Sequence, residues 1–203
     1  MLDEKKRNSM LKEIFRKSIH ICSALVPTLL KIEGAYWYVI IGLAVAAVLY
    51  SLSELLRLKG HNIPLVAKIT MLAARDRDNN KVVFGPITLV CGILIAALVL
   101  PIEYAQLGIY ALAFGDGFAS LVGKAFGHIE IPYSGGKTIA GSSGCFIASS
   151  CAAFLCTHNI FISIVTGILT TLIEGLPLGD YDNLVIPISC SSFYCLAENY
   201  LHF

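Results

Sequence analysis

The amino-acid sequence predicts an all-α integral membrane protein, a polytopic bundle of about seven transmembrane helices with an amphipathic interfacial helix at its N-terminus. Composition is the first observation, because 56% of the 203 residues are hydrophobic and only 14% are charged, whereas soluble domains carry about 25% charged residues. The second is a series of apolar runs, most of them near the ~20 residues that a helix needs to cross a bilayer. The third is a one-sided distribution of basic residues, which predicts an orientation.

The predicted elements follow one another along a single domain, residues 1–203. Residues 1–18 are charged and carry apolar residues such as Met10, Leu11 and Ile14 at helical spacing. This pattern predicts an amphipathic helix on the cytoplasmic membrane surface. The apolar spans that follow are 19–32, 35–56, 82–100, 104–126, 138–157, 159–175 and 184–201. The first of these is short for a transmembrane helix.

The basic residues orient this bundle. With a cytoplasmic N-terminus, every Lys and Arg except Lys31 falls in the inside segments 1–18, 57–81, 124–137 and 176–183. This bias follows the positive-inside rule and predicts that any chemistry faces the cytoplasm, at the plasma membrane if the source is prokaryotic. The net charge is only +1, which argues against nucleic acid as a partner. The sequence does not indicate an oligomeric state.

Asp116 is the first candidate functional residue. It lies between two glycines in the fourth apolar span, where an ionised carboxylate costs at least ~2.5 kcal/mol. Ser120 and Lys124 follow at four-residue steps, so all three side chains are expected on one broad helix face. The carboxylate could bind a metal ion or take a proton from a substrate hydroxyl. The structural alternative is an ion pair of Asp116 with Lys124 or an arginine.

A second cluster, YSGGKTIAGSSG at residues 133–144, begins the fifth apolar span. The bare N–H groups of Gly135 and Gly136, a helix N-terminus and the charge of Lys137 beside Thr138 suit a phosphate group. The cluster is not a P-loop, because the glycine that a P-loop requires five residues before the GKT sequence is an isoleucine.

A third cluster is EGLPLGDYDNLVIP, residues 174–187. Glu174 ends the sixth apolar span, and Asp180 and Asp182 precede Asn183 at the start of the last span. Carboxylates with an asparagine at a membrane face suit Mg²⁺, which prefers oxygen ligands. The alternative is that Asp182 or Asn183 only caps the last helix.

Basic residues form a fourth cluster on the same predicted side of the membrane. Arg16 and Lys17 precede the first apolar span, and Arg75 and Arg77 lie in the long inside loop. Such residues can contact anionic membrane lipids. Because the other clusters share this membrane face, the same residues also fit the phosphates of a nucleotide.

The motifs together resemble the dolichol kinase and phytol kinase family. They are GDGFASLVGK at 115–124, GGKTIAGSSG at 135–144 and EGLPLGDYDNLVIP at 174–187, and RKSIH at 16–20 is similar to the family's N-terminal pattern. Relatives of this family include farnesol kinases and CTP-dependent diacylglycerol kinases, and phosphatidate cytidylyltransferases are more distantly similar.

The resemblance implies a polytopic enzyme that transfers the γ-phosphoryl group of a nucleotide, typically CTP, to a membrane lipid alcohol. A polyprenol such as dolichol, phytol, farnesol and diacylglycerol all remain open as the alcohol, and the sequence does not distinguish CTP from ATP. The motifs match this chain at Asp116, Lys124, Lys137, Thr138, Glu174, Asp180, Asp182 and Asn183. The motifs do not assign a role to each residue.

Chemistry suggests the roles. Mg²⁺ on the triphosphate is expected at Asp180 and Asp182, with Asp116 as a further ligand. Asp116 or Glu174 is expected to accept the proton of the alcohol, and Lys137 is the expected catalytic cation. The residues expected to bind the nucleotide phosphates are Lys124, Gly135, Gly136, Lys137, Thr138, Arg16, Lys17, Arg75, Arg77 and Asn183.

Two other functions remain open from the sequence. A cytidylyltransferase would use the same metal and phosphate groups but attack the α-phosphorus, with a lipid phosphate as acceptor, and Arg75 and Arg77 would suit that acceptor. A small transporter would use Asp116 for an ion. The outer side of the predicted bundle has few charges, and no internal repeat is visible, so transport is the weaker alternative.

Overall fold

The computed structural model describes residues 2–61 and 81–201, and this part of the chain contains nine α-helices and one π-helical segment. They are α1 (Leu2–Cys22), α2 (Leu25–Leu30), α3 (Tyr36–Leu58), α5 (Gly85–Val99), α6 (Ile102–Tyr110), the π-helical η2 (Ala111–Asp116), α7 (Gly117–Phe126), α8 (Ile139–Thr157), α9 (Ile160–Gly175) and α10 (Asp182–Leu201). The only β pairing among these residues is an isolated bridge between Glu130 and Thr138. The prediction of an all-α fold is confirmed.

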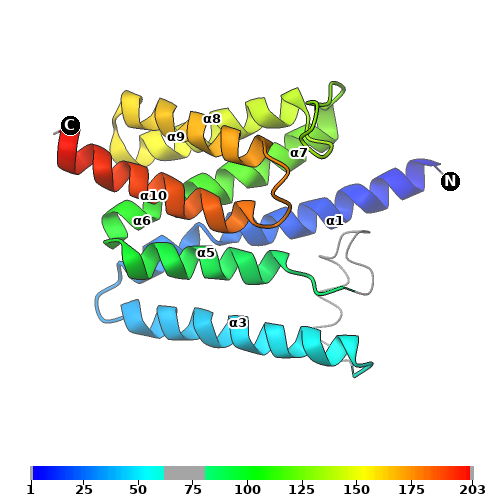
Figure 1. The fold of residues 1–203 in the computed structure, drawn as a ribbon, viewed down its shortest axis with the longest axis horizontal. Coiled ribbons are helices and arrows are strands. Elements are labelled where there is room, and N and C mark those ends of the chain that lie inside the picture. The colour runs from blue at the N-terminus through cyan, green and yellow to red at the C-terminus, as the bar shows by residue number, and fades with distance from the viewer. Residues whose placement is uncertain (1, 62–80, 202–203) are drawn as a thin grey trace.

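The longer helices run along a common long axis, so their connections gather at two ends (Figure 1). The N-terminal end carries the chain's N-terminus, the end of α3 and the loops 127–138 and 176–181; the C-terminal end carries the chain's C-terminus and the short connections 31–35, 100–101 and 158–159. Successive connections thus alternate between the two ends, as the predicted inside and outside segments do. Lys31 lies at the C-terminal end, in the connection 31–35, whereas the other described Lys and Arg residues belong to segments at the N-terminal end. Which end faces the cytoplasm stays a prediction.

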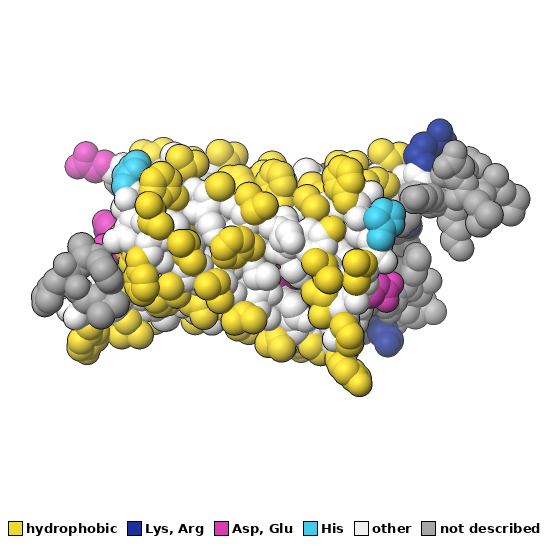
Figure 2. All heavy atoms as spheres, turned by 90° about the horizontal axis from the view of Figure 1, so that it is seen from above, with side chains coloured by type: hydrophobic (Ala, Val, Ile, Leu, Met, Phe, Trp, Pro, Cys, Tyr) yellow, Lys and Arg dark blue, Asp and Glu magenta, His cyan; other side chains and the backbone are white. Residues whose placement is uncertain are grey.

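On the face seen in Figure 2, apolar side chains are spread between the two ends of the bundle, and other helices also expose apolar side chains. On α3, for example, Trp37, Val48 and Leu49 are each about 60% exposed. Among the described residues, three helical stretches are long and apolar enough to cross a membrane, namely Tyr36–Leu58, Ile102–Phe126 and Ile139–Thr157, and α5 and α9 are apolar but shorter. These features support a membrane protein, while the number of seven crossings stays a prediction.

The helical stretch formed by α6, η2 and α7 occupies the middle of the bundle. In its most apolar window 61% of the residues are buried inside the protein, compared with 17% for α3. The π-helical segment η2 ends at Asp116. Such single π turns often occur at functional sites, because they locally change the direction of side chains along a helix.

Two glycines allow α10 to pack closely on its neighbours. A Cβ atom at Gly92 of α5 would lie 2.2 Å from the carbonyl oxygen of Asn183, and one at Gly108 of α6 would lie 2.1 Å from that of Pro187. No side chain fits at either distance. The first half of α10 is therefore held against α5 and α6, and this fixes the position of Asp182, where the helix begins.

The N-terminal helix differs from its prediction. α1 runs unbroken from Leu2 to Cys22, so no structural boundary separates residues 1–18 from the predicted span 19–32. Lys17 and His20 are buried, and α1 packs against η2 and α7. The predicted boundary at residue 18 therefore does not coincide with an end of the helix, and polar residues near it have partners inside the bundle. The position of the preceding residues on the membrane surface stays a prediction.

Candidate active site

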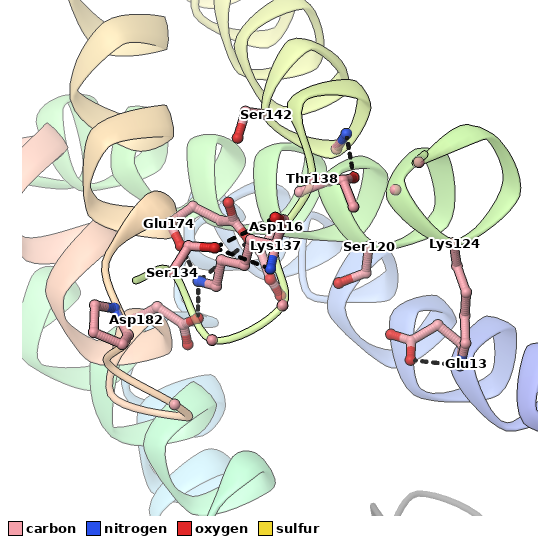
Figure 3. Close-up of a pocket in the computed structure, with 18 of the residues that line it drawn as sticks. Glu13, Asp116, Ser120, Lys124, Ser134, Lys137, Thr138, Ser142, Glu174 and Asp182 are labelled. Carbon is pink, nitrogen blue, oxygen red and sulfur yellow. Dashed lines mark hydrogen bonds and ion pairs between the residues drawn. The ribbon is translucent and has the colours of Figure 1, made fainter. Parts of the chain in front are cut away.

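A cavity of about 620 Å³ lies at the N-terminal end of the bundle (Figure 3). Its wall includes residues of α1, η2, α7, α8, α9 and α10 and of the two loops at this end. The predicted site residues on this wall are Arg16, Asp116, Lys124, Gly135, Gly136, Lys137, Thr138, Glu174 and Asp182. Three motifs that are far apart in the sequence thus line one cavity.

The loop between α7 and α8 presents two glycines to this cavity. It folds back on itself, with the N–H of Ile131 donating to the carbonyl oxygen of Lys137 at 2.8 Å. Gly135 and Gly136 have φ angles of 76° and 92°, a backbone conformation that glycine adopts readily. Within the described residues neither glycine N–H donates a hydrogen bond, so both groups are available to an anionic ligand.

The first turn of α8 is used by the protein itself. The N–H of Ile139 donates to the carbonyl oxygen of Ile129 at 3.0 Å. Thr138 is the N-cap residue, and its hydroxyl oxygen accepts from the N–H of Gly141 at 3.1 Å. Two N–H groups of this turn are thus already bonded inside the protein, and the hydroxyl of Thr138 is engaged as a cap.

Lys137 connects the glycine loop to the third motif (Figure 3). Its Nζ donates to the backbone oxygen of Glu174, and it lies 3.3 Å from Oε1 of Glu174 and 3.7 Å from Oδ2 of Asp182. The other oxygen of Asp182, Oδ1, accepts from the N–H of Asn183 at 2.9 Å. One carboxylate oxygen of Asp182 thus serves the start of α10, while the other faces the ammonium group.

Asp116 is only 4% exposed and is held by two residues of α1. Nζ of Lys17 lies 2.5 Å from its Oδ2, and Nδ1 of His20 lies 3.0 Å from the same oxygen. Among the described residues no hydrogen bond or ion pair reaches Oδ1. The expected structural partner, Lys124 or an arginine, is not found here. Lys17 takes that place because α1 packs directly on η2.

Glu13 holds two basic side chains at the cavity. The guanidinium of Arg16 donates to its Oε1, and Nζ of Lys124 lies 3.2 Å from its Oε2. Burial by itself raises the pKa of Glu13, but the positive charges of Arg16, Lys17 and Lys124 outweigh that effect and lower this pKa below its ordinary value of 4.5. The carboxylate is therefore ionised at neutral pH and neutralises part of the cationic wall.

The three predicted metal ligands all line a second, smaller cavity, but they are not arranged as a metal site. Asp116 is paired with Lys17, and Asp182 faces Lys137. Within residues 2–61 and 81–201, no group of three or more His, Cys, Asp or Glu side chains is placed to hold a metal ion. Asp116 already has a cationic partner in Lys17 of α1.

Several predicted nucleotide ligands have other positions. Lys17 is absent from the lining of the large cavity and is 1% exposed beside Asp116, which does not favour direct contact with phosphate. The side-chain amide of Asn183 donates to the hydroxyl of Thr88 at 3.2 Å and thereby fastens α10 to α5. Arg75 and Arg77 lie outside the described residues.

Two residues that shape the site, Glu13 and Ser134, were not predicted from the sequence, and His20 was included only in the N-terminal pattern RKSIH. The hydroxyl of Ser134 donates to the backbone oxygen of Ile131 at 2.7 Å and accepts from the N–H of Lys137 at 3.1 Å, so it stabilises the glycine loop. Glu13 could have been found, because it lies four residues before Lys17 and seven before His20, on the same polar face of the helix.

Comparisons with known proteins identify relatives among plant enzymes. A protein of Glycine max named probable phytol kinase 1, chloroplastic, is 26% identical over 214 residues, which are 91% of this chain and 67% of that protein. Phytol kinase 1, chloroplastic, of Arabidopsis thaliana is 27% identical over 218 residues, 91% of this chain and 66% of that protein. The farnesol kinase, chloroplastic, of Arabidopsis thaliana is 30% identical over 135 residues, 57% of this chain and 43% of that protein.

The chain thus spans about two thirds of the length of the first two relatives. These similarities confirm the resemblance to lipid-alcohol kinases that the three motifs indicate. No protein-family model matches the chain, and no solved structure matches it.

Proposed function

We propose that this protein is a membrane kinase that transfers the γ-phosphoryl group of CTP to the hydroxyl group of a lipid alcohol, with Mg²⁺. The observation that carries the proposal is the 620 Å³ cavity, where the three motifs of lipid-alcohol kinases meet. The relatives named phytol kinase and farnesol kinase support a kinase with an alcohol as acceptor. The choice of CTP rests on the resemblance of the motifs alone.

The position of the cavity suits two substrates from different phases. Each buried CH₂ group of a lipid is worth ~0.8 kcal/mol, so a long-chain alcohol keeps its tail in the bilayer. The apolar exterior of the bundle would share that bilayer (Figure 2). A polar cavity at one end of such a bundle lies where a water-borne nucleotide and the hydroxyl of a membrane lipid can meet.

The cavity wall supplies groups for the phosphates on two sides. On one side are the N–H groups of Gly135 and Gly136 with the ammonium of Lys137, and on the other are the cations of Arg16 and Lys124. A triphosphate carries several negative charges, and phosphoryl transfer depends mainly on positioning and charge neutralisation. We assign these five residues to the nucleotide.

The donor set at the cavity also fits Mg²⁺. This ion usually keeps its waters and binds one or two protein carboxylates together with phosphate oxygens. Glu174 and Asp182 provide such carboxylates, and their contacts with the ammonium of Lys137 show that the place they line stabilises positive charge. When bound there, Mg²⁺ would neutralise charge on the phosphates.

Asp116 is the proposed general base. The oxygen of the alcohol attacks the γ-phosphorus and loses its proton to the Asp116 carboxylate. The bond between the γ-phosphorus and the β,γ-bridging oxygen breaks, and the nucleoside diphosphate leaves with that electron pair. Lys17 and His20 both contact Oδ2, so Oδ1 is the oxygen available for the proton. Lys17 and His20 are positioning residues in this mechanism.

The orientation of the protein follows from the same proposal. Nucleotides are supplied from the cytoplasm, so the N-terminal end with its cavity would face the cytoplasm, as the basic residues also indicate. Seven crossings, with the predicted spans as their cores, would place the short connections on the outside. In a prokaryotic cell this membrane is the plasma membrane.

Transfer of label from CTP tests the proposal. The purified protein is incubated with Mg²⁺, a panel of lipid alcohols and CTP that is labelled at either the α or the γ phosphorus, and the lipid phase is counted. Label from the γ position alone establishes the kinase. Label from the α position, with a phosphorylated lipid as the required acceptor, would show a cytidylyltransferase instead. ATP replaces CTP in a parallel series to identify the donor.

A further inference from the structure

A second, smaller cavity lies beside the first, between α1, α5 and the start of α10. α1 packs mainly against η2 and α7, whereas α5 packs mainly against α3, α6 and α10. Neither helix has the other as a main packing partner, so a gap remains between them. Its apolar lining comes from both sides, with Ile19 on α1 and Pro86 and Leu89 on α5.

The two cavities share part of their walls. Asp116, Arg16 and Asp182 line both of them. The remaining linings differ in chemistry. The large cavity adds the glycine loop and Lys137. The small cavity, of about 30 Å³, adds the apolar side chains of α1 and α5 together with four polar residues, Lys17, His20, Asp180 and Asn183. Asp116, the proposed base, thus lies between the two cavities. A polar ligand would approach it from the large cavity, and the hydroxyl of an apolar ligand would approach it from the small cavity.

The side of the small cavity is also suited to a membrane ligand. Phe84, next to its lining residues Val83 and Gly85, is 51% exposed. An exposed apolar side chain at the edge of this cavity is compatible with contact to lipid chains. A nucleotide site does not need an apolar side chain at its edge.

We infer that the small cavity between α1 and α5 is the acceptor site, where the hydroxyl group of the lipid alcohol lies at Asp116. The inference rests on the proposed function and deepens it, because it separates the acceptor site from the nucleotide site. The chain of the alcohol leaves between the two helices into the bilayer. Residues at Ile19, Gly85 and Leu89 then determine which width of alcohol chain is accepted.

Filling the small cavity tests this assignment. A Cβ atom at Gly85 would have Asp180 as its nearest neighbour within 4 Å, at 4.0 Å, so a side chain can be added there. We expect Gly85→Leu to raise the KM for the alcohol by about tenfold or more while the KM for the nucleotide changes less than about twofold. Ile19→Phe fills the same cavity from the opposite wall and is expected to act in the same direction.

Two controls match these variants. Gly42→Leu makes the same change on α3, where a Cβ atom would have no neighbour within 4 Å, and it is expected to leave both KM values unchanged. Ser142→Leu narrows the large cavity instead and is expected to raise the KM for the nucleotide more than that for the alcohol. Thermal unfolding of each variant, in the same detergent, establishes that it is folded.

A labelling experiment gives a second measurement that needs no substitution. The wild-type protein in lipid vesicles is irradiated with a long-chain alcohol that carries a photoreactive group near its hydroxyl, and the modified peptides are identified. Labels on residues 16–20 and 83–89 support the inference. Labels confined to α8 and the glycine loop would overturn it.

The two levels of the proposal fail differently. If the wild-type protein transfers label from no nucleotide to any alcohol, the proposed function is wrong and the acceptor site falls with it. If the wild type is active, but Gly85→Leu and Ile19→Phe are folded and keep the wild-type KM for the alcohol, only the acceptor site is overturned.

Discussion

Asp116 and Glu54 are two buried carboxylates in long apolar helices, and their surroundings differ. Glu54 on α3 is 1% exposed, and both of its oxygens are used: Arg57 donates to them at 3.0 and 2.9 Å, and the N–H of Val83 adds a hydrogen bond at 3.1 Å. Lys17 and His20, the two side chains that contact Asp116, both lie at the same oxygen. Asp116 also lines the 620 Å³ cavity.

The comparison shows that burial of a charge does not by itself indicate function. A buried carboxylate must be paired and hydrogen-bonded, since an unpaired one costs several kcal/mol. Glu54 meets this requirement completely with groups that are close by, and it also ties the end of α3 to the start of α5. Asp116 meets it with only one oxygen. The unused oxygen beside a cavity is the feature that we connect with chemistry.

The largest expected effect is on Asp116. Asp116→Asn removes the proposed base, and general base catalysis contributes about 10²–10⁴-fold to a rate, so kcat should fall by that factor. Rates are measured at saturating nucleotide and alcohol and normalised to the folded fraction, because Lys17 loses its counter-charge in this variant. Wild-type kcat in a folded Asp116→Asn protein would remove Asp116 from the reaction.

The second-largest expected effect is on Lys137, which lines the same cavity as Asp116. It faces Glu174 and Asp182 in the structure, and hydrogen bonds to charged groups are worth about 1.5–3 kcal/mol. Lys137→Ala should therefore raise the KM for the nucleotide by roughly 10- to 100-fold. Lys31→Ala is the control, since Lys31 bonds Gln106 at the opposite end of the bundle. Equal KM values in the two variants would contradict the phosphate role.

Glu54 provides the matched test of a structural carboxylate. Glu54→Gln keeps the shape of the side chain but removes the charge that pairs with Arg57, so the free energy of unfolding should fall by about 1.5–3 kcal/mol. Denaturation in detergent measures this change. The kcat of the folded protein should stay at the wild-type value. A loss of kcat as large as that of Asp116→Asn would break the distinction between the two carboxylates.

Glu13 is expected to show the smallest effect, and that effect depends on pH. Its pKa in the folded protein lies below the ordinary value of 4.5. Its contribution to stability is therefore fully present above about pH 4.5 and is lost as the pH falls through the folded pKa. Because the ion pair between Glu13 and Lys124 is partly exposed, we expect it to contribute less than about 1 kcal/mol to the free energy of unfolding at pH 7.

The measurement compares the melting temperature of the wild type with that of Glu13→Gln between pH 7 and about pH 3.5. The difference at pH 7 should shrink toward the lower pH. Glu103→Gln, a change at an exposed residue of the C-terminal end, should show no such difference. A gap between wild type and Glu13→Gln that widens with falling pH would contradict the ion pairs at Glu13.

Much of the helical arrangement could be predicted from periodicity. The predicted spans 35–56 and 138–157 agree within a few residues with α3 and α8, because long apolar runs form helices whatever they pack against. Span 104–126 agrees with the continuous stretch of α6, η2 and α7. The π-helical segment could not be predicted, since apolar patterning does not distinguish its wider turn from an α-helical one.

The candidate site was predictable only in part, for a reason visible at Asp116. The four-residue steps from Asp116 to Ser120 and Lys124 place the three residues on one helix face, and all three line the cavity. The counter-ion was not predictable, because Lys17 is 99 residues away in the sequence. The predicted ligands Asp116, Asp180 and Asp182 line one small cavity, but within the described residues they do not form a group placed to hold a metal ion.

The sequence alone determined which residues are candidates, since apolar runs, glycine pairs and charged motifs are local properties of the chain. It also determined the grouping of basic residues at one end, which follows from the alternation of helices. Only the tertiary structure decided how the charges are paired and that two cavities share Asp116. Electrostatic pairing depends on distances between helices, and those distances come from packing, to which residues far apart in the chain contribute.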